Sequence, residues 1–74
     1  MKIVIRSVSG MGRVKDYSTH PNEETAKREM VKLKKWFLGK GWVASVENPY
    51  VLEKAGITST LTLYMVDVEG IDGV

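Results

Sequence analysis

The chain has 74 residues, of which 43% are hydrophobic and 27% are charged, and its formal net charge is +2. This composition is typical of a small globular domain rather than a disordered tail, and the charge is too small to indicate nucleic acid by itself. The lack of cysteine excludes disulfides, thiolate catalysis and cysteine-ligated zinc. We expect a single domain over residues 1–74, with about one helix packed on one sheet.

The distribution of apolar residues argues against export and membrane insertion. Only three consecutive apolar residues precede Arg6, which is far short of a signal-peptide core. No stretch approaches the roughly 18 apolar residues of a membrane span. We therefore expect a cytoplasmic protein that does not bind membranes.

The first elements along the chain are a predicted pair of strands. Residues 2–8 (KIVIRSV) are rich in Ile and Val, residues 13–18 (RVKDYS) alternate weakly, and a glycine-containing turn joins them. This pattern predicts a β-hairpin. The two glycines of this turn and the following Arg13 could also suit a phosphate-binding loop. Such a loop precedes a helix, whereas this turn precedes a predicted strand, so a hairpin turn is favoured.

A helix is predicted next, from Pro21 in its first turn to a stop at Gly39 and Gly41. Either Asn22 or His20 is the expected N-cap. Apolar residues at helical spacing predict one packed face, with Trp36 at its edge. The members of that face are Ala26, Met30, Leu33 and Phe37.

The charges of this helix predict a balanced first half and a basic second half. Glu23 and Glu24 complement the helix dipole and are expected to pair with Lys27 and Arg28 at a spacing of four residues. The later lysines are predicted to be unpaired, partly complementing the negative end of the dipole. They are Lys32, Lys34, Lys35 and Lys40.

Two more strands are predicted after the helix, at residues 41–47 (GWVASVE) and 57–68 (ITSTLTLYMVDV). The segment between them, residues 49–56, fits either a short helix or a wide hairpin loop. Residues 69–74 are expected to be a loose tail. The predicted fold is α+β in β-β-α-β-β order, with one helix packed on a four-stranded, mainly antiparallel sheet.

The sequence indicates no enzyme. His20 is the only histidine and lies beside a proline at a helix start, without a recognisable nucleophile or acid partner. Asp67, Glu69 and Asp72 lack the spacing of a calcium loop. We expect no catalytic residue, no cofactor and no metal.

Two surfaces remain for a macromolecular partner, which is expected to be a protein. On the helix, Val31 and Leu38 form a second apolar stripe flanked by lysines, and one helix leaves the other sheet face open around Tyr64. The predicted partner-binding residues are Lys27, Val31, Lys34, Lys35, Leu38, Tyr64 and Val66. The open sheet face also predicts a homodimer.

The alternative prediction is a nucleic-acid-binding accessory protein. Basic residues of the helix and hairpin would contact phosphates, and Trp36, Tyr17 or Tyr64 would stack on bases. The basic set is Arg13, Lys15, Lys32, Lys34, Lys35 and Lys40. Arginine is scarce, although it makes most specific base contacts, which favours the protein partner.

The format of the chain, a compact β-β-α-β-β domain without a catalytic signature, is similar to that of small phage-encoded proteins that bind host proteins. This resemblance of format implies an inhibitor of a host or defence protein, in the manner of anti-CRISPR proteins. No residue motif in the sequence supports this resemblance.

Overall fold

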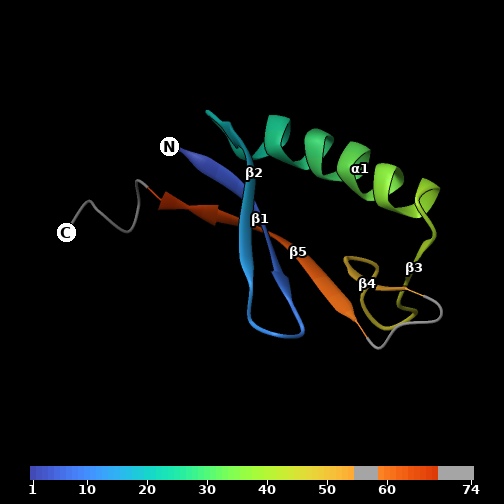
Figure 1. Cartoon of the computed structure of the whole chain (residues 1–74). Helices are drawn as coiled ribbons and strands as arrows, with labels where there is room; N and C mark the ends of the chain where they lie inside the picture. Colours follow the sequence, from blue (N-terminus) through green and yellow to red (C-terminus); the bar gives the residue numbers. More distant parts are fainter. Residues whose placement is uncertain (55–58, 69–74) are drawn as a thin grey trace.

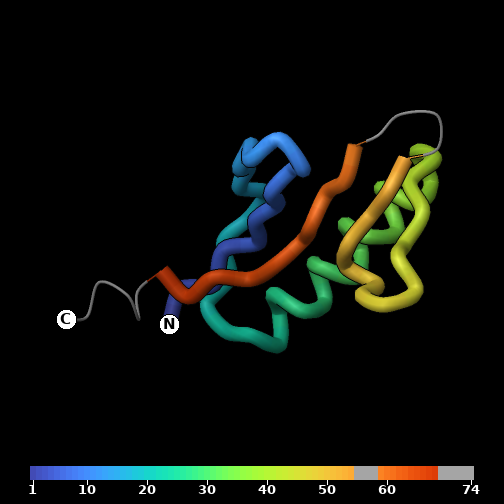
Figure 2. Tube along the Cα trace, turned by 90° about the horizontal axis from the view of Figure 1, so that it is seen from below, coloured from blue at the N-terminus to red at the C-terminus, as the bar shows by residue number. Residues whose placement is uncertain are grey.

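The computed structural model describes residues 1–54 and 59–68. One helix, α1 (Glu23–Gly39), lies across one face of a five-stranded antiparallel sheet (Figure 1). The strands are β1 (Ile3–Ser9), β2 (Val14–His20), β3 (Trp42–Ala44), β4 (Val51–Lys54) and β5 (Thr60–Asp67), and their order in the sheet is β2-β1-β5-β4-β3. The α+β prediction is confirmed. Viewed from the uncovered face, β5 connects the β1–β2 hairpin to the β3–β4 hairpin (Figure 2).

The predicted four-stranded sheet and β-β-α-β-β order are wrong, because part of the segment after Pro49 forms an additional strand. β4 pairs with both β3 and β5, so it is neither a helix nor a loop. A turn at Asn48 starts it: the Asn48 carbonyl accepts from the Val51 N–H at 3.0 Å, and its side chain accepts from the Tyr50 N–H at 3.1 Å. Residues 55–58, which include the predicted start of the last strand, lie outside the described part, as does the predicted tail.

The predicted first hairpin is confirmed, although β2 extends to His20. Its turn closes with a 2.8 Å hydrogen bond from the Ser9 N–H to the Arg13 carbonyl, and Gly12 has a φ of 84° that favours glycine. Ile5 pairs with Ser18, whereas Arg6 pairs with Asp16. The intervening Tyr17 is therefore an extra residue on β2, which makes a β-bulge.

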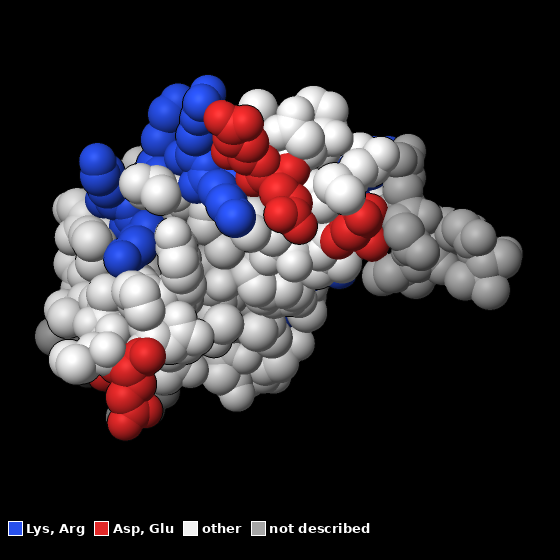
Figure 3. All heavy atoms as spheres, turned by 180° about the vertical axis from the view of Figure 1, so that it is seen from behind, with Lys and Arg blue, Asp and Glu red and all other residues white. Residues whose placement is uncertain are grey.

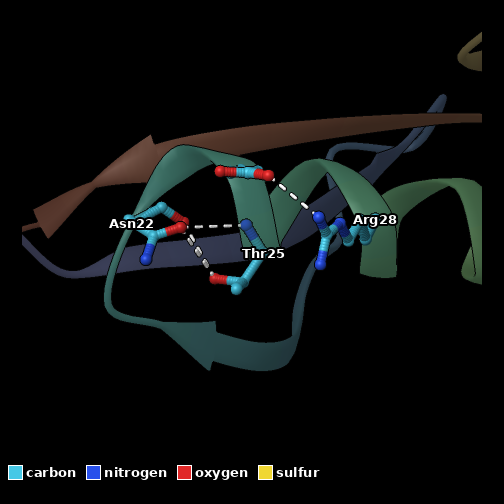
Figure 4. A network of polar contacts seen from close by, with 4 residues as sticks. Asn22, Thr25 and Arg28 are labelled. Atoms are coloured by element: carbon cyan, nitrogen blue, oxygen red, sulfur yellow. Dashed lines mark hydrogen bonds and ion pairs between the residues drawn. The ribbon is translucent and has the colours of Figure 1, made fainter.

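Helix α1 begins and ends at the predicted signals. The Asn22 side chain caps it by accepting from the Thr25 N–H at 2.9 Å, and Glu24 pairs with Arg28 at 2.9 Å (Figure 4). Pro21 precedes the cap instead of lying in the first turn. Gly41 ends the helix with a φ of 98°. The last turn of α1 contains no basic residue, and of the predicted lysines Lys40 lies nearest the negative end of the dipole, at the C-cap.

The core lies between α1 and the sheet. The apolar helix face is buried as predicted: Ala26, Met30 and Phe37 are buried and Leu33 is half-buried. The main buried cluster consists of Ile5, Met30, Phe37, Leu52 and Leu63. Leu52 is fully buried, which explains why the β4 segment joins the sheet.

Candidate functional site

An open groove of about 600 Å³ lies between α1 and β2. Ile5, Leu33 and Phe37 give it an apolar base, and Tyr17 and Trp36 add aromatic surface. Its remaining lining residues are polar or charged: Lys15, Ser18, Glu29 and Lys32. We call this site, with these nine residues, the α1–β2 groove.

Aromatic packing fixes the shape of the groove. The Phe37 ring lies edge-on to Trp36, with centroids 5.1 Å apart, and to Tyr17, with centroids 6.2 Å apart. Trp42 packs on Phe37 in the same manner at 5.9 Å. Phe37 is buried whereas Trp36 is 56% exposed. A buried ring thus holds an exposed indole against the groove, and edge-to-face packing favours this arrangement.

The β-bulge determines which β2 side chains reach the groove. Because Tyr17 is the extra residue, Tyr17 and Ser18 are consecutive and yet both line the groove. The Tyr17 hydroxyl lies 2.9 Å from the buried Ser7 hydroxyl, which fixes the ring from the sheet side. The Ser18 hydroxyl lies 2.8 Å from His20 Nε2. Both side chains are therefore held in place by hydrogen bonds.

A second groove of about 570 Å³ adjoins the first and shares Glu29 and Lys32 with it. Its other lining residues are His20, Thr25, Arg28, Val31 and Lys35. Together the two grooves are lined by four basic side chains, Lys15, Arg28, Lys32 and Lys35, and by one carboxylate, Glu29. The continuous surface is therefore positive.

Aromatic rings hold several of the lysines. Lys15 Nζ lies 5.3 Å from the centre of the Tyr17 ring, and Lys40 Nζ lies 5.4 Å from that of Trp36. Cation–π contacts of this kind are worth roughly 0.5–1 kcal/mol at exposed sites. Lys32 instead contacts Glu29 at 3.3 Å, so the prediction that Lys32 is unpaired is wrong. The spacing of three residues accounts for that pair.

The predicted partner residues on α1 do not all lie together. Val31 and Leu38 are 42% and 39% exposed, and Lys27 and Lys35 are exposed as well. Lys34 is half-buried, with Nζ 5.2 Å from the Tyr50 ring centre on the β4 side of the helix. Of this set, Val31 and Lys35 line the second groove, and the others line neither of the two grooves. From behind, basic side chains gather along the top of the molecule, where α1 lies, with acidic side chains beside them (Figure 3).

The other predicted surface, around Tyr64 and Val66, lies on the sheet face opposite α1, and both side chains are half-buried. Val4, the strand partner of Val66, is only 7% exposed. Arg6 donates to Asp16 at 2.6 Å across the same face, and this hydrogen bond lowers the pKa of the Asp16 carboxyl. The helix surface and the sheet surface are therefore separate sites.

The alternative nucleic-acid set is brought together only in part. Lys15 and Lys32 meet at the α1–β2 groove, beside Tyr17 and Trp36. Arg13 lies instead where the β1–β2 turn enters β2, and its N–H donates to the Ser9 hydroxyl at 3.1 Å. Lys34 contacts Tyr50, toward the other end of the sheet.

Sequence reasoning did not find the α1–β2 groove. One wall comes from β2 and the other from the part of α1 that begins at Glu29, so no local spacing reveals the groove. Two signals pointed toward it: the weak alternation of residues 13–18, which reflects the bulge, and a tryptophan beside the buried helix face. Neither signal specifies a groove.

Other kinds of site receive no support from the described residues. In residues 1–54 and 59–68, no group of three or more His, Asp or Glu side chains is arranged to hold a metal ion. Within the same residues, no helix has the length and hydropathy needed to cross a membrane. No protein-family model matches the chain, and comparison with curated proteins and with solved structures yields no match either.

Proposed function

We propose that this protein acts by binding another protein at the α1–β2 groove, without catalysing a reaction. The observation that carries the proposal is Trp36, a 56%-exposed indole beside an apolar base and charged side chains. Tryptophan is enriched among residues that dominate binding energy, and an apolar centre within a polar rim is the usual anatomy of an interface. An inhibitor of a host or defence protein is one form that this role can take.

A catalytic role has a weaker basis. Ser18 and His20 resemble a nucleophile and a base, since their side chains lie 2.8 Å apart. They stand two residues apart on one strand, and no carboxylate among the described residues is hydrogen-bonded to His20 to orient it. The third group of a catalytic triad is thus missing from the described part, and binding remains the better proposal.

Affinity capture tests the proposal. Immobilised wild type, incubated with a lysate of the source organism, is expected to retain specific proteins that Trp36→Gln loses. Met11→Gln is the matched control, because Met11 is an exposed apolar residue that lines neither groove. Equal retention by wild type and Trp36→Gln, with both variants folded, would refute the groove as the binding site.

Nucleic acid is the second candidate, favoured by the grouping of Lys15, Lys32 and Lys40 with Tyr17 and Trp36. If four lysines, including Lys35, neutralise phosphates, the log–log dependence of duplex affinity on salt should have a slope of about −3 to −4. Gel shifts with duplex DNA, single strands and RNA measure it. Absence of any shift at micromolar protein in ~50 mM salt would eliminate this candidate.

A further inference from the structure

The two grooves together follow one edge of the sheet. In the described sheet β2 is an outer strand, paired with β1 alone. Lys15, Tyr17 and Ser18 line the α1–β2 groove, and His20 lines the groove that adjoins it. The surface therefore extends along nearly the whole of β2, beside a strand edge whose outward backbone groups are available for pairing.

The dimensions of this surface suit an extended peptide segment. The six residues of β2 from Lys15 to His20 span about 20 Å at roughly 3.3 Å per residue. On the facing wall, α1 contributes residues from Thr25 to Phe37, and these 13 residues span about 20 Å at 1.5 Å per residue. We call the two grooves together the trough. Its two walls are of similar length, and it would accept about five or six residues of extended chain.

The charge of the trough indicates the charge of the peptide segment that it would bind. Four basic side chains line it and one acidic side chain opposes them. Glu29 is already engaged by Lys32, and Arg28 by Glu24. Lys35 and Lys15 form no ion pair within the described residues, and the Lys15 ammonium lies over the Tyr17 ring. A segment with carboxylates is the complementary ligand.

The bulge adds selectivity. Tyr17 interrupts the regular pairing pattern of β2. A bulge on an edge strand hinders non-specific pairing of that edge with a strand of another chain. The interruption coincides with the apolar base of the α1–β2 groove, where Tyr17 and Trp36 both pack on Phe37. A segment that places an apolar side chain at this point gains burial that an all-polar strand does not.

We infer that the trough binds an acidic, extended segment of a partner protein, which lies along β2 with one apolar side chain in the α1–β2 groove. This inference rests on the proposed function, and names the class of partner. The carboxylates of the segment lie toward Lys15, Lys32 and Lys35.

Selection from a display library of random peptides of about ten residues tests the inference. The selected peptides are expected to combine Asp or Glu with one apolar residue. A fluorescein-labelled consensus peptide should then bind Lys32→Glu and Lys35→Glu about tenfold more weakly than wild type, by anisotropy, and more weakly in high salt. Lys2→Glu is the matched control: it makes the same charge change on an exposed side chain that lines neither groove, and it should stay within about twofold.

The outcomes separate the two proposals. Peptides without acidic residues that still require Trp36 would overturn the acidic segment and leave protein binding intact. Failure to select any peptide, together with lysate capture that is independent of Trp36, would overturn both. If labelled oligothymidylate binds more tightly than the peptide, and the same lysine variants weaken it, the trough belongs to nucleic acid and the inference fails.

Discussion

Phe37 links the stability of the fold to the shape of the candidate site. Its ring is 7% exposed, lies in the main buried cluster, and also lines the α1–β2 groove. Tyr17, Trp36 and Trp42 each meet it edge-on. A change at this one side chain therefore alters both the core and the binding surface.

Replacing Phe37 by alanine should lower the free energy of unfolding by about 3–5 kcal/mol, because it removes a buried ring and leaves a cavity. This loss is comparable to the whole stability expected of a domain this small. Urea or thermal unfolding followed by circular dichroism measures it. Trp36→Ala is the comparison, because removing the half-exposed indole should lower the free energy of unfolding much less. An unchanged melting curve for Phe37→Ala would contradict the packing of α1 described above.

At the scale of the element, α1 depends on its N-terminal cap. Asn22 Oδ1 accepts from the Thr25 N–H at 2.9 Å, and the Asn22 carbonyl accepts from the Thr25 hydroxyl at 3.2 Å (Figure 4). Glu23 and Glu24 add negative charge to the first turn. The start of the helix also sets the position of Thr25 and Arg28, which line the second groove.

Asn22→Ala should reduce the free energy of unfolding by about 1 kcal/mol, the typical cost of losing a cap. Asn22→Asp, which retains an acceptor oxygen, is the matched control and should remain close to wild type. Denaturant titrations of the three proteins at one pH give the comparison. Equal losses for both variants would mean that the cap hydrogen bond is not the source of the effect.

At the scale of the whole molecule, the uncovered sheet face predicts self-association. The middle strand of the sheet is β5 (Figure 2), and its Tyr64 and Val66 lie on this face, where they pair with Arg6 and Val4 of β1. Arg6 and Asp16 lie on the same face and are already paired with each other. A symmetric dimer that buries this face therefore need not leave either charge unpaired.

Light scattering should give wild type twice the mass of one chain, and Tyr64→Glu the mass of one chain, because a carboxylate on the buried face costs desolvation energy. Met11→Glu is the control, since Met11 lies in the β1–β2 turn and is 95% exposed. A monomer in all three proteins would exclude the sheet face as a dimer interface. That result would leave the α1–β2 groove proposal untouched.

The sequence by itself determined the features that depend on neighbours along the chain. The cap, narrowed to Asn22 or His20, the stop at Gly39 and Gly41, and the buried face of α1 follow from side-chain hydrogen bonding, the freedom of glycine and the helical repeat. The first hairpin follows from its glycine turn. These elements were predicted because their causes lie within a few residues of their effects.

Only the tertiary structure decided the additional strand and the groove. The β4 segment is too short to be identified by its own pattern, and it becomes a strand because β3 and β5 supply partners on both sides and bury Leu52. Tyr17 and Trp36 lie far apart along the chain and line one groove only because α1 packs beside β2. Burial and pairing between distant segments are properties of the packed chain, and local sequence patterns do not contain them.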